Sequence, residues 1–207
     1  EAAAELLRAD GILAVRGLGG FHLAADATSE AAVARLRRRK RREAKPLAVM
    51  VRTLSEARAL AQVGADEAGL LTAPERPVVL LRCVPGALAP SVAPGLDTVG
   101  VMLAYTPLHH LLLEGAGRPL VMTSGNRSEE PIAIGNGEAR RRLAGIADGF
   151  LLHDREIVSR YDDSVLRVTG AAPMFLRRAR GYAPRALGLP VASPVPLVAV
   201  GPHLKNT

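Results

Sequence analysis

Basic side chains crowd into one short segment of this 207-residue chain. Residues 35–45, RLRRRKRREAK, hold eight basic residues and one acidic residue, so this segment alone equals the formal net charge of +7. Lysine is rare, with three against 24 arginines, and two of the three are Lys40 and Lys45. Such a segment indicates an anionic partner: a nucleic acid, a membrane surface or the phosphates of a small ligand. The alternative is a solvated helix face.

A hydroxyl-rich stretch, Thr123-Ser-Gly-Asn-Arg-Ser128, follows an expected strand. Ligands of α/β sheets bind at the carboxyl ends of strands. Ser124 and Asn126 could therefore hydrogen-bond phosphate or ribose oxygens, while the glycine between them lets the backbone approach. An ordinary Asx or Ser turn is the alternative. Gly17-Leu-Gly-Gly20 also follows a strand, but it matches neither the dinucleotide fingerprint nor the P-loop, and alone it favours a tight turn.

Asp162 and Asp163 open an expected strand. Adjacent acids could bind Mg²⁺ or act as a general base. They could equally pair with the arginines of residues 177–180 across a hairpin. Cationic side chains, hydroxyls and this acid pair suit phosphate handling, because nucleotidyl transfer needs mostly positioning and charge neutralisation.

The histidines and the single cysteine predict no metal site. His109 and His110 are adjacent on an expected helix, where neighbouring side chains point about 100° apart and cannot jointly grip one ion. His22 and His153 have no convincing partner, and a lone histidine is more often a structural hydrogen-bonding group. Cys83 excludes an internal disulfide framework and favours a core thiol in a reducing, cytoplasmic compartment.

The elements that must position these residues alternate between strands and helices, which predicts an α/β fold, and a closing hairpin predicts a mixed sheet. The core must be aliphatic, because aromatic residues make up 3% of the chain. No apolar run approaches the roughly 20 residues of a membrane span. The expected strands are 12–15, 47–51, 78–82, 120–123, 150–152, 164–169, 174–177 and 197–200. The expected helices are 30–39, 53–64, 66–72, 106–115 and 136–143, with an opening helical pattern at residues 1–10.

The pattern changes at about residue 187, where proline-spaced residues begin. We therefore predict one domain over 1–187, and over 188–207 a linker with the first strand of a following domain. The chain opens inside a helical pattern without Met, so we expect it to be a fragment of a longer protein.

Several motifs resemble those of a known family. Lys40-x-Arg42-x-x-Lys45-Pro-Leu resembles the K-x-R…PL signature of YrdC-like domains, and residues 119–128 resemble their P-L-x-x-T-S-A-N-x-S motif. Longer strings, including GLGGFHLAADA, KPLAVMV, VMTSGNRS and FLRRARGYAP, resemble the HypF carbamoyltransferases of hydrogenase maturation, in order over residues 11–184.

The resemblance implies an open, twisted, mixed sheet flanked by helices, with a basic nucleotide cleft that binds ATP and Mg²⁺. It implies that carbamate derived from carbamoyl phosphate becomes carbamoyl-adenylate with release of pyrophosphate. The next domain of HypF then passes the carbamoyl group to a HypE acceptor protein. We expect this chain to bind ATP without carbamoylating a thiol itself.

The resemblance also implies roles for individual residues. The catalytic pair would be Lys40 and Arg42, binding the ATP phosphates. The residues that bind the nucleotide or the carbamoyl group would be Lys45, Thr123, Ser124, Asn126, Ser164 and Arg177. Asp163 would lie near the nucleotide, through Mg²⁺, while Asp162 pairs with an arginine.

Three alternatives stay open. The same fold and adenylate chemistry serve threonylcarbamoyl-adenylate synthases and antibiotic O-carbamoyltransferases. The basic segment could instead belong to a double-stranded RNA-binding module. Against RNA binding, Phe and Tyr total only six residues, which leaves few platforms on which bases can stack.

Overall fold

The computed structural model describes residues 1–127, 130–170, 172–188 and 190–198. Within these ranges nine strands form one mixed sheet in the order β7-β1-β2-β6-β3-β5-β4-β8-β9. The strands are β1 (Leu13–Arg16), β2 (Phe21–Asp26), β3 (Val49–Val51), β4 (Val78–Arg82), β5 (Thr98–Leu103), β6 (Leu120–Ser124), β7 (Gly149–Leu151), β8 (Val165–Thr169) and β9 (Ala172–Arg177). The predicted α/β fold with a mixed sheet is confirmed.

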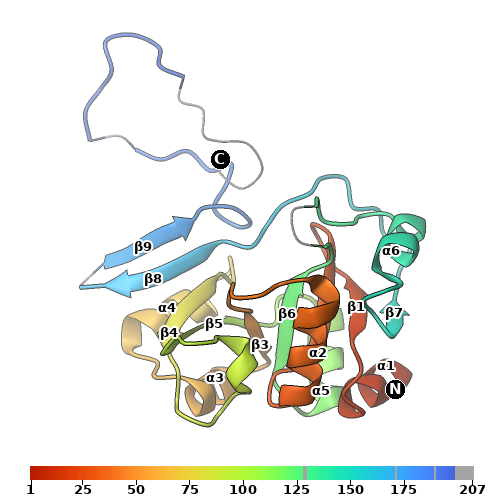
Figure 1. The fold of residues 1–207 in the computed structure, drawn as a ribbon. Coiled ribbons are helices and arrows are strands. Elements are labelled where there is room, and N and C mark those ends of the chain that lie inside the picture. Colours follow the sequence, from red (N-terminus) through yellow and green to blue (C-terminus); the bar gives the residue numbers. More distant parts are fainter. Residues whose placement is uncertain (128–129, 171, 189, 199–207) are drawn as a thin grey trace.

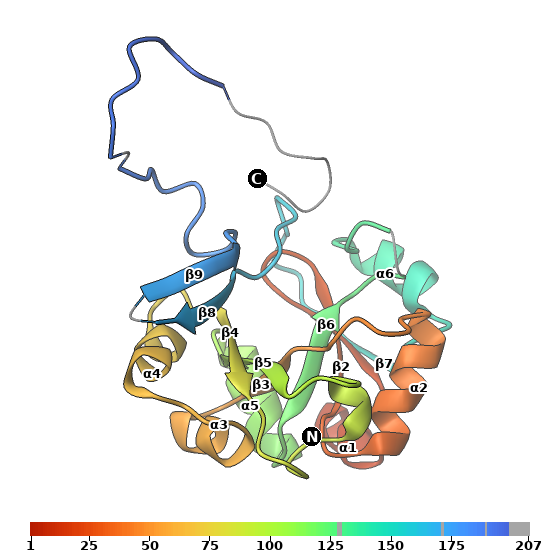
Figure 2. The same cartoon turned by 60° about the vertical axis from the view of Figure 1, so that its left-hand side comes forward.

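Helices cover both faces of the sheet (Figures 1 and 2). The helices are α1 (Ala2–Arg8), α2 (Glu30–Lys40), α3 (Leu54–Leu60), α4 (Ala65–Thr72), α5 (Pro107–Ala116) and α6 (Asn136–Leu143), with a 3-10 turn η1 (Pro90–Val92). Apolar side chains of α2, α3, α4 and α6 pack on one face, and those of α1 and α5 pack on the other. Among the described residues no helix has the length and apolar character that crossing a bilayer requires.

Local signals explain most helix starts. Thr53 and Thr106 are the N-caps of α3 and α5, where their hydroxyls accept backbone N–H bonds, and Pro107 begins α5 as expected. The expected end of α5 at Gly115 is wrong. Gly115 packs instead against Ala4 of α1, where a Cβ would come within 2.9 Å of the Ala4 Cβ. The helix stops at Gly117, whose positive φ of 66° ends it in the left-handed region.

Two strands were not predicted from the sequence. Strand β2 directly follows the Gly17–Gly20 turn and pairs with β1 as a hairpin. Strand β5 follows the proline-rich loop and lies between β3 and β4. The glycine segment is therefore a tight turn between two strands. The expected strand at 197–200 falls partly on residues 199 and 200, which lie outside the described ranges, and the division at residue 187 stays a prediction.

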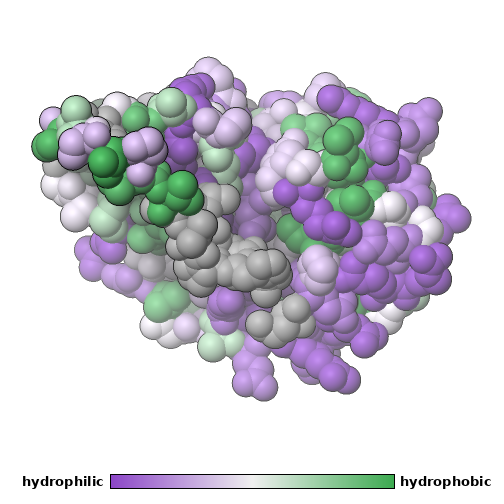
Figure 3. All heavy atoms as spheres, turned by 90° about the horizontal axis from the view of Figure 1, so that it is seen from above, coloured by the Kyte–Doolittle hydropathy of each residue, from purple (hydrophilic) through white to green (hydrophobic). Residues whose placement is uncertain are grey.

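The hairpin of β8 and β9 forms one end of the sheet, opposite β7 (Figure 1). It turns at Gly170, whose φ is +64°. Met174, Phe175 and Leu176 of β9 are exposed. Seen from above, apolar side chains gather on the hairpin side and hydrophilic ones dominate the side of α6 (Figure 3).

Candidate functional site

The end of β6 forms the floor of the site. Strand β6 runs into Ser124, Gly125 and Asn126, and the Gly125 N–H donates to the Phe21 carbonyl at 2.6 Å. A Cβ on Gly125 would lie 2.5 Å from the Cβ of Phe21, so the close approach of these two segments requires glycine. The resulting bend carries Ser124 and Asn126 onto the wall of a cavity.

Lys40 is the last residue of α2, and its side chain forms hydrogen bonds with this bend. Its side chain is buried, and its ammonium donates to the carbonyl of Ser124, to the carbonyl of Asn126 at 2.7 Å and to Asn126 Oδ1 at 2.8 Å. Ser124 Oγ donates to the same Oδ1 at 2.7 Å. The Lys40 side chain therefore lies against Ser124 and Asn126, and its expected role at the ATP phosphates stays a prediction. Its ammonium contacts loop oxygens, so its first effect is to order the loop.

Arg42 and Arg177 are two cations from distant parts of the chain. Arg42 follows α2, and Arg177 ends β9 and lines the cavity. Burial lowers the pKa of Arg42, and the nearby charges of Arg37 and Arg177 lower it further. Within the described ranges neither Arg42 nor Arg177 forms an ion pair with a carboxylate. Cations without a described counter-charge are stabilised by an anionic ligand. Arg177 lines the cavity, whereas Arg42 is not among its lining residues.

The cavity has a volume of about 750 Å³ and opens between three segments: the loop after β6, residues 159–162 before β8, and residues 177–184 after β9. Four of its lining residues are arginines. They are Arg160, Arg177, Arg178 and Arg180. Tyr161 also lines it and packs against Gly19, where a Cβ would come within 2.7 Å of the Tyr161 ring. No local sequence signal marks Arg160, Tyr161 or the cavity role of Arg180, since only the fold brings these segments together.

Not every residue of the predicted site faces the cavity. Lys45 is exposed on the turn after α2, and Thr123 is buried in β6, where it pairs with Leu23. Ser164 is fully buried: its hydroxyl accepts from the Ala179 N–H at 2.8 Å and donates to the Arg180 carbonyl at 2.9 Å. Ser164 therefore holds residues 179–180 in place. Ser128 of the loop motif lies outside the described residues.

The two neighbouring aspartates have the opposite placement from the one expected. Asp163 accepts from Arg180 Nε at 2.9 Å, and Asp162 lines the cavity. The expectation that Asp162 pairs with an arginine while Asp163 lies near the ligand is therefore wrong. Asp163 is not among the residues that line the cavity, and its Oδ2 lies 3.9 Å from Nε2 of His22 on β2, so its carboxylate faces the sheet.

A cluster of buried polar rings lies behind Asp163. His22 of β2, Tyr105 after β5 and His109 of α5 pack together, with ring centroids of Tyr105 and His109 4.5 Å apart. The Arg180 guanidinium lies 3.8 Å above the Tyr105 ring. Burial lowers the pKa of His22, and it lowers that of His109 to about 3, so both imidazoles are neutral near pH 7. The sequence analysis found no role for these histidines, since nothing local marks their meeting.

Arg16 and Cys83 lie away from the cavity. Arg16 is buried, and its guanidinium donates to Asn136 Oδ1 at 2.8 Å and to the His153 carbonyl at 2.7 Å. Cys83 is half-buried against the carbonyl of Leu60, and burial raises the pKa of its thiol. Neither side chain meets the loop after β6.

The acidic residues on the cavity wall fit Mg²⁺ only as an ion that arrives bound to a polyphosphate. Across the described part of the chain, no three His, Cys, Asp or Glu side chains gather closely enough to hold a metal ion. Of the acids on the cavity wall, Glu130 is paired with Arg142 at 3.0 Å, whereas Asp162 has no ion pair with a described residue. Mg²⁺ usually takes one or two carboxylates plus substrate phosphates. Asp162 is suited to complete the shell of an ion that arrives with a polyphosphate.

Comparisons with known proteins cover almost the whole chain. The model of the Sua5/YciO/YrdC family, described as telomere recombination, matches residues 5–179. Carbamoyltransferase HypF2 of Cupriavidus necator is 54% identical over 227 residues, which cover 100% of this chain and 28% of that protein. Threonylcarbamoyl-AMP synthase of Bacillus subtilis is 30% identical over 155 residues, 71% of this chain and 45% of that enzyme.

A solved structure of a HypF protein is also similar to most of this chain. The crystal structure of full-length HypF in the phosphate- and nucleotide-bound form has a TM-score of 0.87 and 50% sequence identity, and covers 89% of this chain and 29% of that one. This chain thus spans little more than a quarter of the length of the HypF proteins that it matches.

Proposed function

Since the chain belongs to the Sua5/YciO/YrdC family, we propose that it binds ATP and forms carbamoyl-adenylate as part of a HypF-type carbamoyltransferase. The observation that carries this proposal is the set of four arginines, Arg177 among them, that line the cavity beside Ser124 and Asn126. The HypF structure in its phosphate- and nucleotide-bound form, at 50% identity, supports the same ligand class.

The proposed reaction is an in-line displacement at phosphorus. An oxygen of carbamate, derived from carbamoyl phosphate, attacks the α-phosphorus of ATP. A new oxygen–phosphorus bond forms, the bond from the α-phosphorus to the bridging oxygen breaks, and pyrophosphate leaves with the electron pair. No covalent protein intermediate is needed, so the chain contributes positioning and charge neutralisation.

The described residues divide this work between them. Arg42 and Arg177 neutralise the charge that builds on the departing pyrophosphate, since both lack a described carboxylate partner. Lys40 keeps the Ser124–Asn126 bend in the shape that meets the nucleotide. Mg²⁺ would arrive with ATP, with Asp162 beside it, and would offset phosphate charge.

The step after adenylate formation lies outside this assignment. In the proposed HypF-type protein, the carbamoyl group passes to an acceptor protein of the HypE kind, through parts of the relatives that this chain does not span. We propose a cytoplasmic setting for both steps.

The test is ATP binding and pyrophosphate release by Arg177→Gln. We expect about 10- to 100-fold weaker ATP binding, the range for losing a charge-assisted contact. Pyrophosphate release, assayed with ATP, Mg²⁺ and carbamoyl phosphate or bicarbonate, should fall in parallel. Arg167→Gln is the matched control, because Arg167 is an exposed arginine of the same hairpin on β8. Equal ATP affinity in the two variants contradicts the proposal.

The second candidate is threonylcarbamoyl-adenylate synthesis, which the 30% identity to the Bacillus subtilis enzyme supports. L-threonine discriminates between the two functions. If pyrophosphate release from ATP and bicarbonate depends on added L-threonine, the second candidate replaces the first. The RNA-binding alternative predicts instead a duplex affinity that collapses steeply as salt rises.

A further inference from the structure

Arg37 is a buried cation that meets no carboxylate among the described residues. It lies in the last turn of α2 and is 8% exposed. Its Nε donates to the Ser91 carbonyl, and its Nη2 donates to the Val92 carbonyl at 3.2 Å. Both acceptors belong to η1, which Glu30 of the same helix also holds through the Ser91 N–H at 3.0 Å. One side of the guanidinium is thus anchored to a fixed part of the core.

The other side of the same guanidinium holds residues 41–46, which we call the basic turn. Nη1 of Arg37 donates to the carbonyls of Arg42 at 3.1 Å and Glu43 at 3.2 Å, and Nη2 donates to that of Lys45 at 3.1 Å. The basic turn contains no helix or strand residue. Five N–H donors therefore meet five backbone carbonyls, which matches the donor number and planar fork of arginine.

The position of Arg42 depends on the shape of this turn. The Arg42 guanidinium folds back and donates to the carbonyls of Lys45 at 3.1 Å and Pro46 at 2.7 Å. If the turn changed shape, these acceptors would move and the Arg42 guanidinium would move with them. The positive charge of Arg177 disfavours a charged Arg42, so Arg42 needs an anchor that holds it in place before a ligand arrives.

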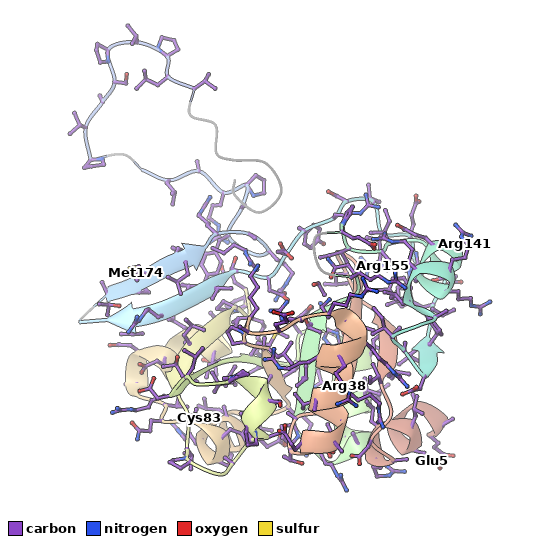
Figure 4. The ribbon with its side chains drawn as sticks, in the orientation of Figure 1. Glu5, Arg38, Cys83, Arg141, Arg155 and Met174 are labelled. Carbon is purple, nitrogen blue, oxygen red and sulfur yellow. The ribbon has the colours of Figure 1, made fainter. Side chains whose placement is uncertain are left out.

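We propose that Arg37 is a positioning residue: it clamps the basic turn by its carbonyls and so holds Arg42 in place for the ATP phosphates. This inference rests on the proposed function, and Arg37 itself contacts no ligand in it. It distinguishes Arg37, which organises the turn, from its neighbour Arg38, which is exposed on the outer surface of α2 (Figure 4).

The experiment compares Arg37→Lys with Arg38→Lys in the 207-residue chain. Lysine keeps the charge and the stem but has three donors at one point in place of the planar fork. We expect Arg37→Lys to weaken ATP binding about tenfold, the effect of a lost charge-assisted contact. The affinity for AMP, which lacks the β- and γ-phosphates, should change less than about twofold by the same reasoning. Isothermal titration measures both, and Arg38→Lys should match the wild type.

A second measurement needs no nucleotide. The amides of Arg42 and Leu47 donate to the carbonyls of Arg37 and Val92, so hydrogen exchange reports whether the turn is held. Both amides should be protected in the wild type and in Arg38→Lys, and should exchange faster in Arg37→Lys. If Arg37→Lys does not fold, the wild-type exchange alone decides, since unprotected amides at both positions overturn the clamp.

The outcomes separate the two proposals. A wild type that binds no ATP but keeps protected amides contradicts the proposed function and leaves the clamp supported. Arg37→Lys with wild-type ATP affinity and wild-type exchange overturns the clamp. An equal loss of ATP and AMP affinity also overturns it, because that result indicates a general structural defect and not a displaced phosphate contact.

Discussion

The two sides of the proposed phosphate site are held in different ways. Arg37 holds the basic turn by donating to backbone carbonyls alone. Residues 177–184, which we call the arginine wall, are held by Arg180, and its guanidinium pairs with Asp163, donates to the carbonyls of Glu75 and Arg76 and stacks on Tyr105. Both holds use a guanidinium, but only the second includes an ion pair with a carboxylate, and that carboxylate lies 3.9 Å from His22.

This difference shows how a basic sequence can provide charge for a ligand. The guanidinium groups of Arg37 and Arg180 donate to protein acceptors, whereas neither Arg42 nor Arg177 has a described carboxylate partner. Carbonyl acceptors carry no net charge, so the first hold does not cancel the positive field at the site. The second hold does so in part, because the Asp163 carboxylate pairs with Arg180.

The largest expected effect is at Lys40, which joins α2 to the loop between the two sides. Lys40→Met removes the ammonium that donates to the carbonyls of Ser124 and Asn126 and to Asn126 Oδ1, and it leaves the Ser124 carbonyl and Oδ1 with only the Asn126 N–H and the Ser124 hydroxyl as described donors. We expect the free energy of unfolding to fall by about 3 kcal/mol. Denaturant unfolding measures it, with Arg38→Met as a control that should change by less than about 0.5 kcal/mol. A similar loss in both variants would contradict the assignment.

The second effect is the dependence of stability on pH. The pKa of His109 is about 3 in the folded chain, against an ordinary value of 6.5, so the unfolded state binds more protons between these values. The free energy of unfolding should therefore fall as the pH drops below 6.5, with the loss complete near pH 3. At pH 4.5 this group accounts for about 3 kcal/mol.

The non-titrating variant His109→Phe isolates this contribution. His22, Tyr105, Arg180 and the neighbouring His110 surround the ring, and burial lowers the pKa of His22 in the same direction. Unfolding at pH 7 and pH 4.5 should show a smaller difference for His109→Phe than for the wild type. His110→Phe, at an exposed position of the same helix, should keep the wild-type difference. Equal pH dependence in all three proteins would rule out a neutral buried His109.

The smallest effect separates the adjacent aspartates. Asp163→Asn removes the carboxylate from a mostly buried ion pair with Arg180 and should lower the free energy of unfolding by about 2 kcal/mol. Asp162→Asn should change it by less than about 0.5 kcal/mol, because Asp162 pairs with no described cation. It should instead weaken the Mg²⁺ dependence of ATP binding. The reverse order of stabilities would return the two residues to the roles first expected.

Local sequence patterns predicted most helices and strands, but they did not predict two strands inside the sheet. The N-caps Thr53 and Thr106, the strand at Val78–Arg82 and the hairpin turn at Gly170 rest on short-range chemistry and are confirmed. Strands β2 and β5 were missed because each directly follows a glycine- or proline-rich segment that reads as a continuing loop. Their strand character comes from burial between neighbouring strands, which is a tertiary property.

For the site, motif resemblance found the residues better than it found their contacts. Lys40 lies at the Ser124–Asn126 loop as expected, yet its ammonium binds loop oxygens. Ser164 was expected at the ligand and instead holds residues 179–180. A motif records which residue types occur together, and it cannot distinguish a side chain that touches a ligand from one that shapes the wall beside it.

The sequence by itself determined the helix caps, the aliphatic core, the mixed α/β class and the concentration of charge in residues 35–45. Only the tertiary structure decided which of those charged side chains form hydrogen bonds within the protein and which face solvent. Arg37 and Arg38 are neighbours of the same type, but one points into the core and meets five carbonyls while the other faces solvent. The reason is that a guanidinium can be buried only where the fold places hydrogen-bond acceptors around it. For Arg37, two of these acceptors are the carbonyls of residues 91 and 92, more than fifty positions along the chain.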